Sequence, residues 1–138
     1  MKKAIVYATT TGNTEAMANA IKEGAEASGA SVYFSTADSA DEGEVTSSDV
    51  IFLGSPAMGD EVLEDSAEDF FAKIEGSLSG KKVAIFGSYD WGDGQWLRDW
   101  ADRISSTGAT VLNGEGLKIN LTPDADGLEE CKKLGAIS

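Results

Sequence analysis

The sequence predicts one α/β domain in which an open, five-stranded parallel sheet carries helices on both faces. Two observations support this prediction. Short apolar, β-branched runs alternate along the chain with segments whose apolar residues recur at helical spacing. The runs at residues 50–53 and 83–86 are apolar without interruption, which is typical of parallel strands covered on both faces. Alternating strands and helices favour a parallel sheet with right-handed crossovers.

The first half of the chain contains three predicted strands. Residues 4–8 form the first strand and lead through a hydroxyl-rich turn into a helix that ends at Gly29, the usual place for a left-handed cap. Residues 31–36 are β-prone but partly polar, which predicts an edge strand. Residues 36–48 are acidic and weakly patterned, and we expect a loop with at most a short helical turn before the strand at 50–53.

The second half continues the alternation. Apolar residues at helical spacing predict helices over residues 63–74 and 96–104, on either side of the fourth strand. The last strand begins at Ala109 and is interrupted at residues 113–116, either by a bulge or by a small excursion. Pro123 opens a short terminal helix.

Composition excludes several classes of protein. No apolar run approaches the ~20 residues that span a bilayer, and no signal peptide is expected. The single cysteine, Cys131, excludes an internal disulfide and suits a reducing cytoplasm. With no histidine and one cysteine, the chain cannot build ordinary zinc, iron–sulfur or Ser-His-Asp sites.

The formal net charge of −13 argues against binding to nucleic acid or to an anionic membrane, because both need a basic surface. The acidic residues are clustered, since no Lys or Arg occurs between Glu23 and Ala72. This cluster is either a solubilising face or a surface that steers basic partners.

Three unusual segments follow the first, third and fourth strands, at residues 9–14, 55–61 and 88–94. Ligands of open parallel sheets bind outside the carboxyl ends of the strands, where the strand order reverses. The first segment brings threonines and an asparagine to a helix N-terminus, which suits a phosphate held by neutral donors. The second carries Met58 and a turn glycine, and the third presents a tyrosine and Trp91 among glycines. Together they predict a pocket for a phosphorylated, flat, apolar ring.

These three segments resemble the FMN-binding loops of flavodoxins, in the same order and at compatible spacing. The similarity extends over essentially the whole chain and is greatest to the short-chain flavodoxins of anaerobic bacteria. The resemblance implies a flavodoxin-like sheet with strand order 2-1-3-4-5 and a single FMN-binding domain over residues 1–138. It assigns the following residues to the cofactor: Thr9, Thr10, Thr11, Gly12, Asn13, Thr14, Ser55, Pro56, Ala57, Met58, Gly59, Asp60, Glu61, Ser88, Tyr89, Asp90, Trp91 and Gly92.

The resemblance also implies roles for some of them. Thr9, Thr11 and Thr14 would give hydroxyls to the FMN phosphate, together with backbone N–H groups of residues 10–14. Met58 would cover the inner face of the isoalloxazine ring and Trp91 the outer face. A thioether and an indole both pack well on a flat ring.

Gly59 and Glu61 carry the redox tuning that the resemblance implies. In flavodoxins the peptide after this glycine turns over, so that its carbonyl accepts a hydrogen bond from N5 of the flavin semiquinone. Glycine reaches positive φ at little cost, so the peptide between Gly59 and Asp60 would separate the two reduction steps. The Glu61 carboxylate matches a residue that meets the flavin N3–H. Acidic residues would crowd the flavin rim and disfavour the anionic hydroquinone; they are Asp60, Glu61, Glu64, Asp65, Asp90 and Asp93.

We therefore expect a low-potential, one-electron carrier that shuttles noncovalent FMN between semiquinone and hydroquinone. We expect it to be a cytoplasmic monomer whose partners are basic-surfaced reductases and oxidoreductases. One alternative is a small FMN-dependent quinone or nitro reductase, which usually needs longer insertions. Another is a flavodoxin-like accessory protein that activates a partner enzyme. A response-regulator receiver shares the sheet order but needs an acceptor aspartate after the third strand, where Gly54 and Ser55 stand.

Overall fold

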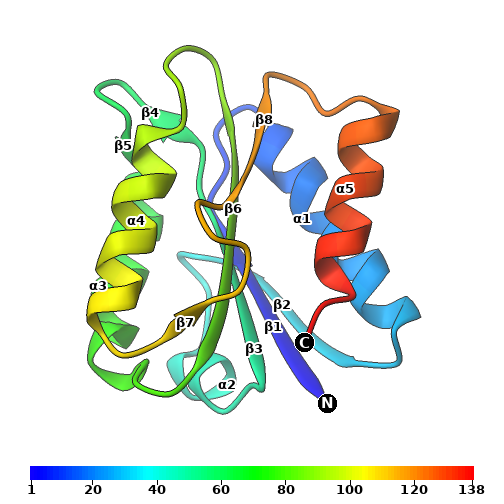
Figure 1. The fold of residues 1–138 in the computed structure, drawn as a ribbon, viewed down its shortest axis with the longest axis vertical. Coiled ribbons are helices and arrows are strands. Elements are labelled where there is room, and N and C mark those ends of the chain that lie inside the picture. Colours follow the sequence, from blue (N-terminus) through cyan, green and yellow to red (C-terminus); the bar gives the residue numbers. More distant parts are fainter.

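The computed structural model describes residues 1–138 and contains one parallel sheet (Figure 1). Its strands follow the order β2-β1-β3-β6-β7, and β8 also pairs with β6, so the predicted order 2-1-3-4-5 is confirmed. The strands are β1 (Lys2–Tyr7), β2 (Ser31–Thr36), β3 (Val50–Gly54), β6 (Lys82–Tyr89), β7 (Thr110–Val111) and β8 (Leu117–Asn120).

Helices cover both faces of the sheet, because alternate residues of each strand point to opposite sides. Figure 1 shows α1 and α5 on one face of the sheet and α3 and α4 on the other. Ile5 of β1 packs in the same apolar cluster as residues of α1 and α5, whereas Val6 packs in the cluster that contains residues of α3 and α4. None of the helices has the length and the apolar character that a membrane span requires. The helices are α1 (Asn13–Ala27), α2 (Glu42–Thr46), α3 (Asp65–Ile74), α4 (Gln95–Ser106) and α5 (Ala125–Gly135), with a 3-10 turn, η1 (Glu75–Ser77).

The fifth strand is split by an excursion, which decides between the two alternatives left open by the sequence. Val111 pairs with Val83 and Leu117 with Phe86, so residues 112–116 stand opposite only residues 84 and 85 of β6. The side-chain amide of Asn113 replaces the missing backbone partner. Its Oδ1 accepts from the Ile85 N–H at 3.1 Å and its Nδ2 donates to the Ile85 carbonyl at 2.7 Å. The hydrogen bonds between β6 and the fifth strand therefore continue through the Asn113 side chain.

Helices α1 and α5 pack without side chains between them at two glycines. A Cβ atom added to Gly24 would lie 2.7 Å from the carbonyl carbon of Lys132. A Cβ atom added to Gly135 would lie 2.9 Å from the Ala25 nitrogen. Both positions exclude larger residues, so this contact fixes how α1 lies on α5.

The buried Lys3 joins the C-terminal ends of the same two helices. Its Nζ donates to the carbonyl of Gly135 at 2.8 Å and to Oγ of Ser28 at 3.3 Å. A cation is favoured there because helix C-termini are negative. Burial nevertheless lowers the pKa of the Lys3 ammonium.

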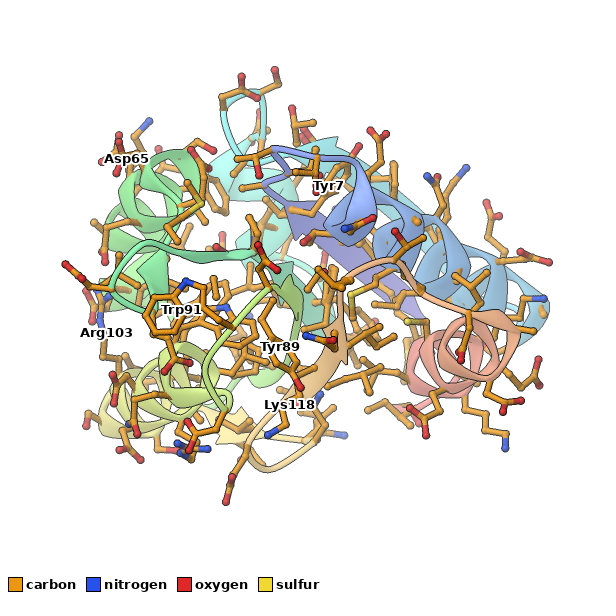
Figure 2. All side chains as sticks on the ribbon, turned by 90° about the horizontal axis from the view of Figure 1, so that it is seen from above. Tyr7, Asp65, Tyr89, Trp91, Arg103 and Lys118 are labelled. Carbon is orange, nitrogen blue, oxygen red and sulfur yellow. The ribbon has the colours of Figure 1, made fainter.

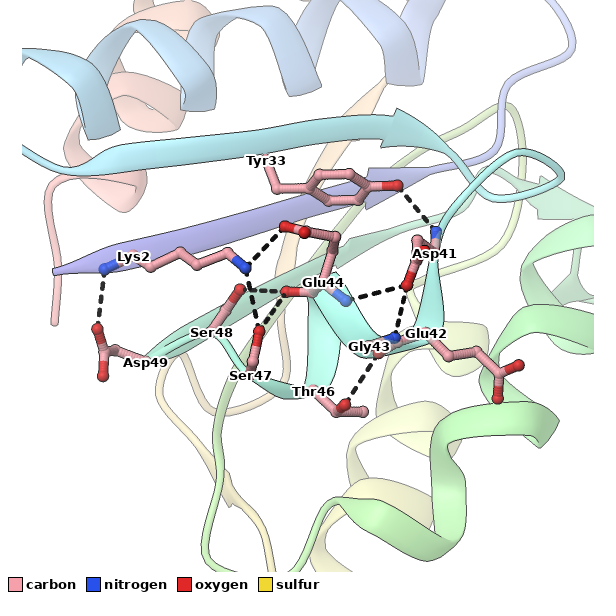
Figure 3. Close-up of polar contacts among 10 residues, drawn as sticks. All are labelled: Lys2, Tyr33, Asp41, Glu42, Gly43, Glu44, Thr46, Ser47, Ser48 and Asp49. Carbon is pink, nitrogen blue, oxygen red and sulfur yellow. Dashed lines mark hydrogen bonds and ion pairs between the residues drawn. The ribbon is translucent and has the colours of Figure 1, made fainter.

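The acidic segment between β2 and β3 contains a short helix, α2, as expected (Figure 3). The Asp41 carboxylate caps it by accepting from the backbone N–H of Gly43, and the Asp41 N–H donates to the Tyr33 hydroxyl at 2.8 Å. Lys2 ties α2 to β1, with Nζ 2.8 Å from Oε2 of Glu44 and 3.0 Å from Oγ of the C-terminal cap residue, Ser47. Figure 3 shows these contacts between α2 and residues of β1 and β2.

Three boundaries differ from the sequence prediction. Leu63 was expected to begin a helix, but it lies in a two-residue strand, β5 (Val62–Leu63), that pairs antiparallel with β4 (Ala57–Met58). Strand β6 runs on through Ser88 and Tyr89, because both pair with β8. The terminal helix α5 begins after its cap, Asp124, rather than at Pro123.

Candidate cofactor site

A pocket of about 310 Å³ lies where β1, β3 and β6 end. Its walls come from four segments of the chain, and the sheet order brings together the three that follow β1, β3 and β6. Figure 2, which looks onto the molecule from above, shows Tyr89 and Trp91 there. The pocket is lined by Thr10, Thr11, Asn13, Pro56, Ala57, Met58, Gly59, Ser88, Tyr89, Asp90, Trp91 and Leu121.

One end of the pocket is the N-terminus of α1. Gly12 has φ 91° and caps the helix without a side chain, and its own N–H donates to Oγ1 of Thr9 at 3.1 Å. The backbone N–H groups of residues 13–15 therefore have no acceptor in the protein. By contrast, a carboxylate caps each of α2, α3 and α5. The unpaired donors and the positive end of the helix dipole favour an anion at this end.

The other end is formed by two segments with apolar side chains. Met58 ends β4 and is half-buried, whereas Trp91 is 60% exposed in the loop after β6. Residues 59–61 connect β4 to β5, and the Glu61 N–H donates to the Met58 carbonyl at 2.7 Å. A flat ring placed between Met58 and Trp91 would cover apolar surface that now faces solvent.

Two predicted residues that do not line the pocket support it from beneath. Ser55 is fully buried, and its Oγ accepts from the Glu64 N–H at 2.9 Å and donates to the Pro56 carbonyl. Thr14 is 1% exposed, and its Oγ1 accepts from the Ser88 N–H at 3.4 Å. The structure thus places both hydroxyls in contacts within the protein.

The Glu61 carboxylate also lies outside the pocket lining. Its Oε1 accepts from the backbone N–H groups of Gly94 and Gln95, at 3.2 and 3.0 Å. Gly92 is packed against this carboxylate, since an added Cβ atom would lie 2.7 Å from each of its oxygens. Gly92 is itself outside the lining, as are the remaining predicted residues Thr9, Gly12 and Asp60.

Sequence reasoning missed the loop after β8. Leu121 lines the pocket, is 49% exposed and has φ 58°, and its carbonyl accepts from Oγ of Ser88 at 2.7 Å. Next to it, Oγ1 of Thr122 donates to Oδ1 of Asn13 at 3.1 Å. The sequence signal was weak because the fifth strand, whose carboxyl end carries this loop, is interrupted.

Charge at the mouth of the pocket is uneven. Asp60 and Asp90 are exposed and form no ion pair. Asp93, in contrast, accepts from the Arg98 guanidinium at 2.8 Å, which lowers the pKa of the Asp93 carboxyl. The Lys118 ammonium donates to the Asp93 carbonyl at 2.6 Å. Unpaired negative charge therefore lies on the hairpin formed by β4 and β5 and on the start of the loop after β6.

The arrangement combines anion-binding amides, two apolar walls and a reversal of strand order at one sheet edge. A model of the flavodoxin family matches residues 5–135, which is most of the chain. This chain belongs to the flavodoxin family. It is accordingly a small electron carrier that binds FMN and interacts with oxidoreductases, and it is not itself an enzyme.

Individual relatives agree over nearly their full length. The chain is 49% identical to a flavodoxin from Megasphaera elsdenii, over 95% of this chain and 93% of the relative. It is 42% identical to a flavodoxin from Clostridium beijerinckii, over 95% and 94% of the two chains. Among solved structures, a flavodoxin from the domain Archaea has a TM-score of 0.90 at 32% identity and covers 99% of this chain and 94% of its own. The two-electron reduced Megasphaera elsdenii flavodoxin has a TM-score of 0.84 at 46% identity, over 97% and 96% of the two chains.

Proposed function

We propose that this flavodoxin passes single electrons between oxidoreductases with basic surfaces, using FMN held noncovalently in the pocket above β1, β3 and β6. The observation that carries the proposal is the polarity of the pocket. Three unpaired backbone N–H groups lie at one end, and Met58 and Trp91 lie at the other. FMN has the same polarity, with a dianionic phosphate at one end and a flat ring at the other.

The donor set at the N-terminus of α1 fits a phosphate. The N–H groups of residues 13–15 supply hydrogen bonds without any cation, since no Lys or Arg lines the pocket. The hydroxyls of Thr10 and Thr11 and the amide of Asn13 line the same end. Hydrogen bonds to an ionised acceptor are stronger than those between neutral groups, so neutral donors suffice here.

We assign the predicted site residues to two kinds of role. Those that line the pocket would contact FMN directly, and Leu121 joins them. Thr14 and Ser55 would support the pocket through their contacts beneath it. Bound FMN supplies the redox chemistry, while the residues of this chain bind it, limit its contact with water and surround its ring with negative charge.

The excess of acidic residues supports partners with basic surfaces. Of the acidic residues near the hairpin, Asp60 and Asp65 are exposed and form no ion pair. Opposite charge accelerates encounter and is screened by salt. We also propose that residues 1–138 form a single domain. A monomer is supported by the repulsion between copies with a net charge of −13, and a cytoplasmic location by the reduced, buried Cys131.

Stepwise reduction of the FMN-loaded protein tests the one-electron proposal. We expect a spectrum of a one-electron-reduced flavin to accumulate during the titration and then decay. Direct conversion from oxidised to two-electron-reduced flavin would refute it. Transfer to a basic partner should slow as the salt concentration rises, and Asp60→Lys with Asp65→Lys should weaken that dependence. A transfer rate that does not depend on salt would refute the basic-partner proposal.

A further inference from the structure

The pocket has two apolar walls, and they belong to separate segments of the chain. Met58 and Gly59 lie in the hairpin between β4 and β5, whereas Asp90 and Trp91 lie in the loop between β6 and α4. Glu61 lines neither wall, yet its side chain joins the two segments.

Helix α4 lacks an N-terminal cap of its own. Its cap residue is Gly94, and its first turn contains no acidic residue. Oε1 of Glu61 accepts from the N–H groups of Gly94 and Gln95 instead, across a gap in sequence of more than thirty residues. A carboxylate at a helix N-terminus interacts both with these unpaired donors and with the helix dipole.

The backbone of Glu61 is strained where this contact is made. Glu61 has φ 53°, in the left-handed region, and is one of only two non-glycine residues with positive φ. Residues 59–61 form a three-residue hairpin loop, in which glycine is the usual residue at the left-handed position. A glutamate there is less stable than a glycine, because its Cβ atom crowds the backbone at positive φ, and the contact with α4 offsets this cost.

Gly92 completes the contact from the other side. Its φ is 91°, and an added Cβ atom would collide with the Glu61 carboxylate. Glu61 therefore stands where glycine is usual, and Gly92 packs against its carboxylate. The two residues form one contact.

We propose that Glu61 is a positioning residue that clasps the hairpin to the N-terminus of α4, so that the two walls of the pocket open and close together. The proposal concerns the protein's own contacts and deepens the proposed function, because it identifies what sets the distance between the Met58 and Trp91 walls. It adds a role for Glu61 that does not require contact with FMN.

Amide hydrogen exchange in the cofactor-free protein tests the clasp. In Glu61→Ala, exchange of the Gly94 and Gln95 amides should accelerate about tenfold or more, because they lose a charged acceptor. Amides in β1 and β3 should be unchanged after correction for global stability. The matched control is Asp60→Asn, which removes the same charge one residue away and should leave both amides protected.

Two further variants separate the clasp from a general loss of structure. Glu61→Gln keeps an oxygen acceptor and should exchange more slowly than Glu61→Ala at Gly94 and Gln95. Glu61→Gly relieves the positive φ and keeps the hairpin, but should exchange as fast as Glu61→Ala. Unchanged protection in Glu61→Ala, or equal exchange in Glu61→Gln and Glu61→Ala, would overturn the proposal.

Joint opening has its own signature. In the wild-type protein the amides of Glu61, Gly94 and Gln95 should exchange with equal protection factors, and in Glu61→Gly the Glu61-position amide should separate from the other two. Unequal protection in the wild type would overturn joint opening. Failure of the wild type to bind FMN would contradict the proposed function but would leave this result unaffected.

Discussion

Replacing Gly12 by alanine should weaken the binding of FMN without weakening the binding of riboflavin, which lacks the phosphate. Gly12 has φ 91° at the cap of α1, and an added Cβ atom would meet nothing within 4 Å. The substitution therefore introduces backbone strain and no steric clash. Left-handed backbone costs an L-residue about 1–2 kcal/mol. Since Gly12 is exposed, the cofactor-free loop can relax away from the strain.

Binding a phosphate requires the N–H groups of residues 13–15 to converge, so the strain returns on binding. A cost of about 1–2 kcal/mol corresponds to a roughly five- to thirtyfold rise in the FMN dissociation constant. Quenching of flavin fluorescence measures this constant for both FMN and riboflavin. The riboflavin constant should stay within about a factor of two, because the ring walls are untouched.

Gly29, at the other end of the same helix, provides the control. Its φ is 92°, and an added Cβ atom there would also meet nothing within 4 Å. Gly29→Ala therefore introduces the same strain far from the pocket, and should lower the free energy of unfolding without altering FMN affinity. If Gly29→Ala weakened FMN binding as much as Gly12→Ala, or if riboflavin lost as much affinity as FMN, the assignment of the phosphate to this helix end would be wrong.

Three other results are expected. Gly59 has no positive φ and an added Cβ atom would meet nothing within 4 Å, so Gly59→Ala should be as stable as its control, Gly76→Ala. It should nevertheless lower the first reduction potential by roughly 40–90 mV and so narrow the gap to the second. An unchanged gap in a redox titration would contradict the peptide rotation that the resemblance implies. The Arg103 hydrogen bonds lower the pKa of Glu68, so this pair stabilises the fold above about pH 4.5 and loses that effect as the pH falls through the lowered pKa. Glu68→Gln should thus lower the free energy of unfolding, measured by urea titration, by about 0.5–1 kcal/mol at pH 7 and should not change it at pH 2. An equal loss at both pH values would refute the ion pair. Burial raises the pKa of Cys131 to about 12. An aromatic disulfide reagent at pH 8 should therefore modify this thiol only after the protein unfolds. Rapid modification of the folded protein would show that the thiol is accessible.

The sheet could be predicted because its strands leave strong local signals. Residues 50–53 and 83–86 are uninterrupted apolar runs, and both form central strands. The positions of the three loops follow from strand order alone, since ligands bind where that order reverses. The residue types in those loops then indicated a binding site for a phosphate and a flat ring.

The hairpin and the fifth strand could not be predicted, for different reasons. Strands β4 and β5 have two residues each, too few to show a period of two. The break in the fifth strand is bridged by the Asn113 side chain, a long-range contact with no local signature. Leu121 and Glu61 adopt positive φ although neither is glycine, so the usual marker of such turns is absent.

The close glycine contact between α1 and α5 also affects the far end of α1. About 16 Å of helix separates Gly24 from Asn13, at 1.5 Å per residue. A tilt of a few degrees at the contact would therefore move the free N–H groups at Asn13 by about 1 Å, enough to lengthen a hydrogen bond beyond its useful range. The positions of the N–H groups that would bind a phosphate are consequently set by the backbone packing between α1 and α5. Residues such as Gly24, which no ligand touches, are under the same constraint as those that line the pocket.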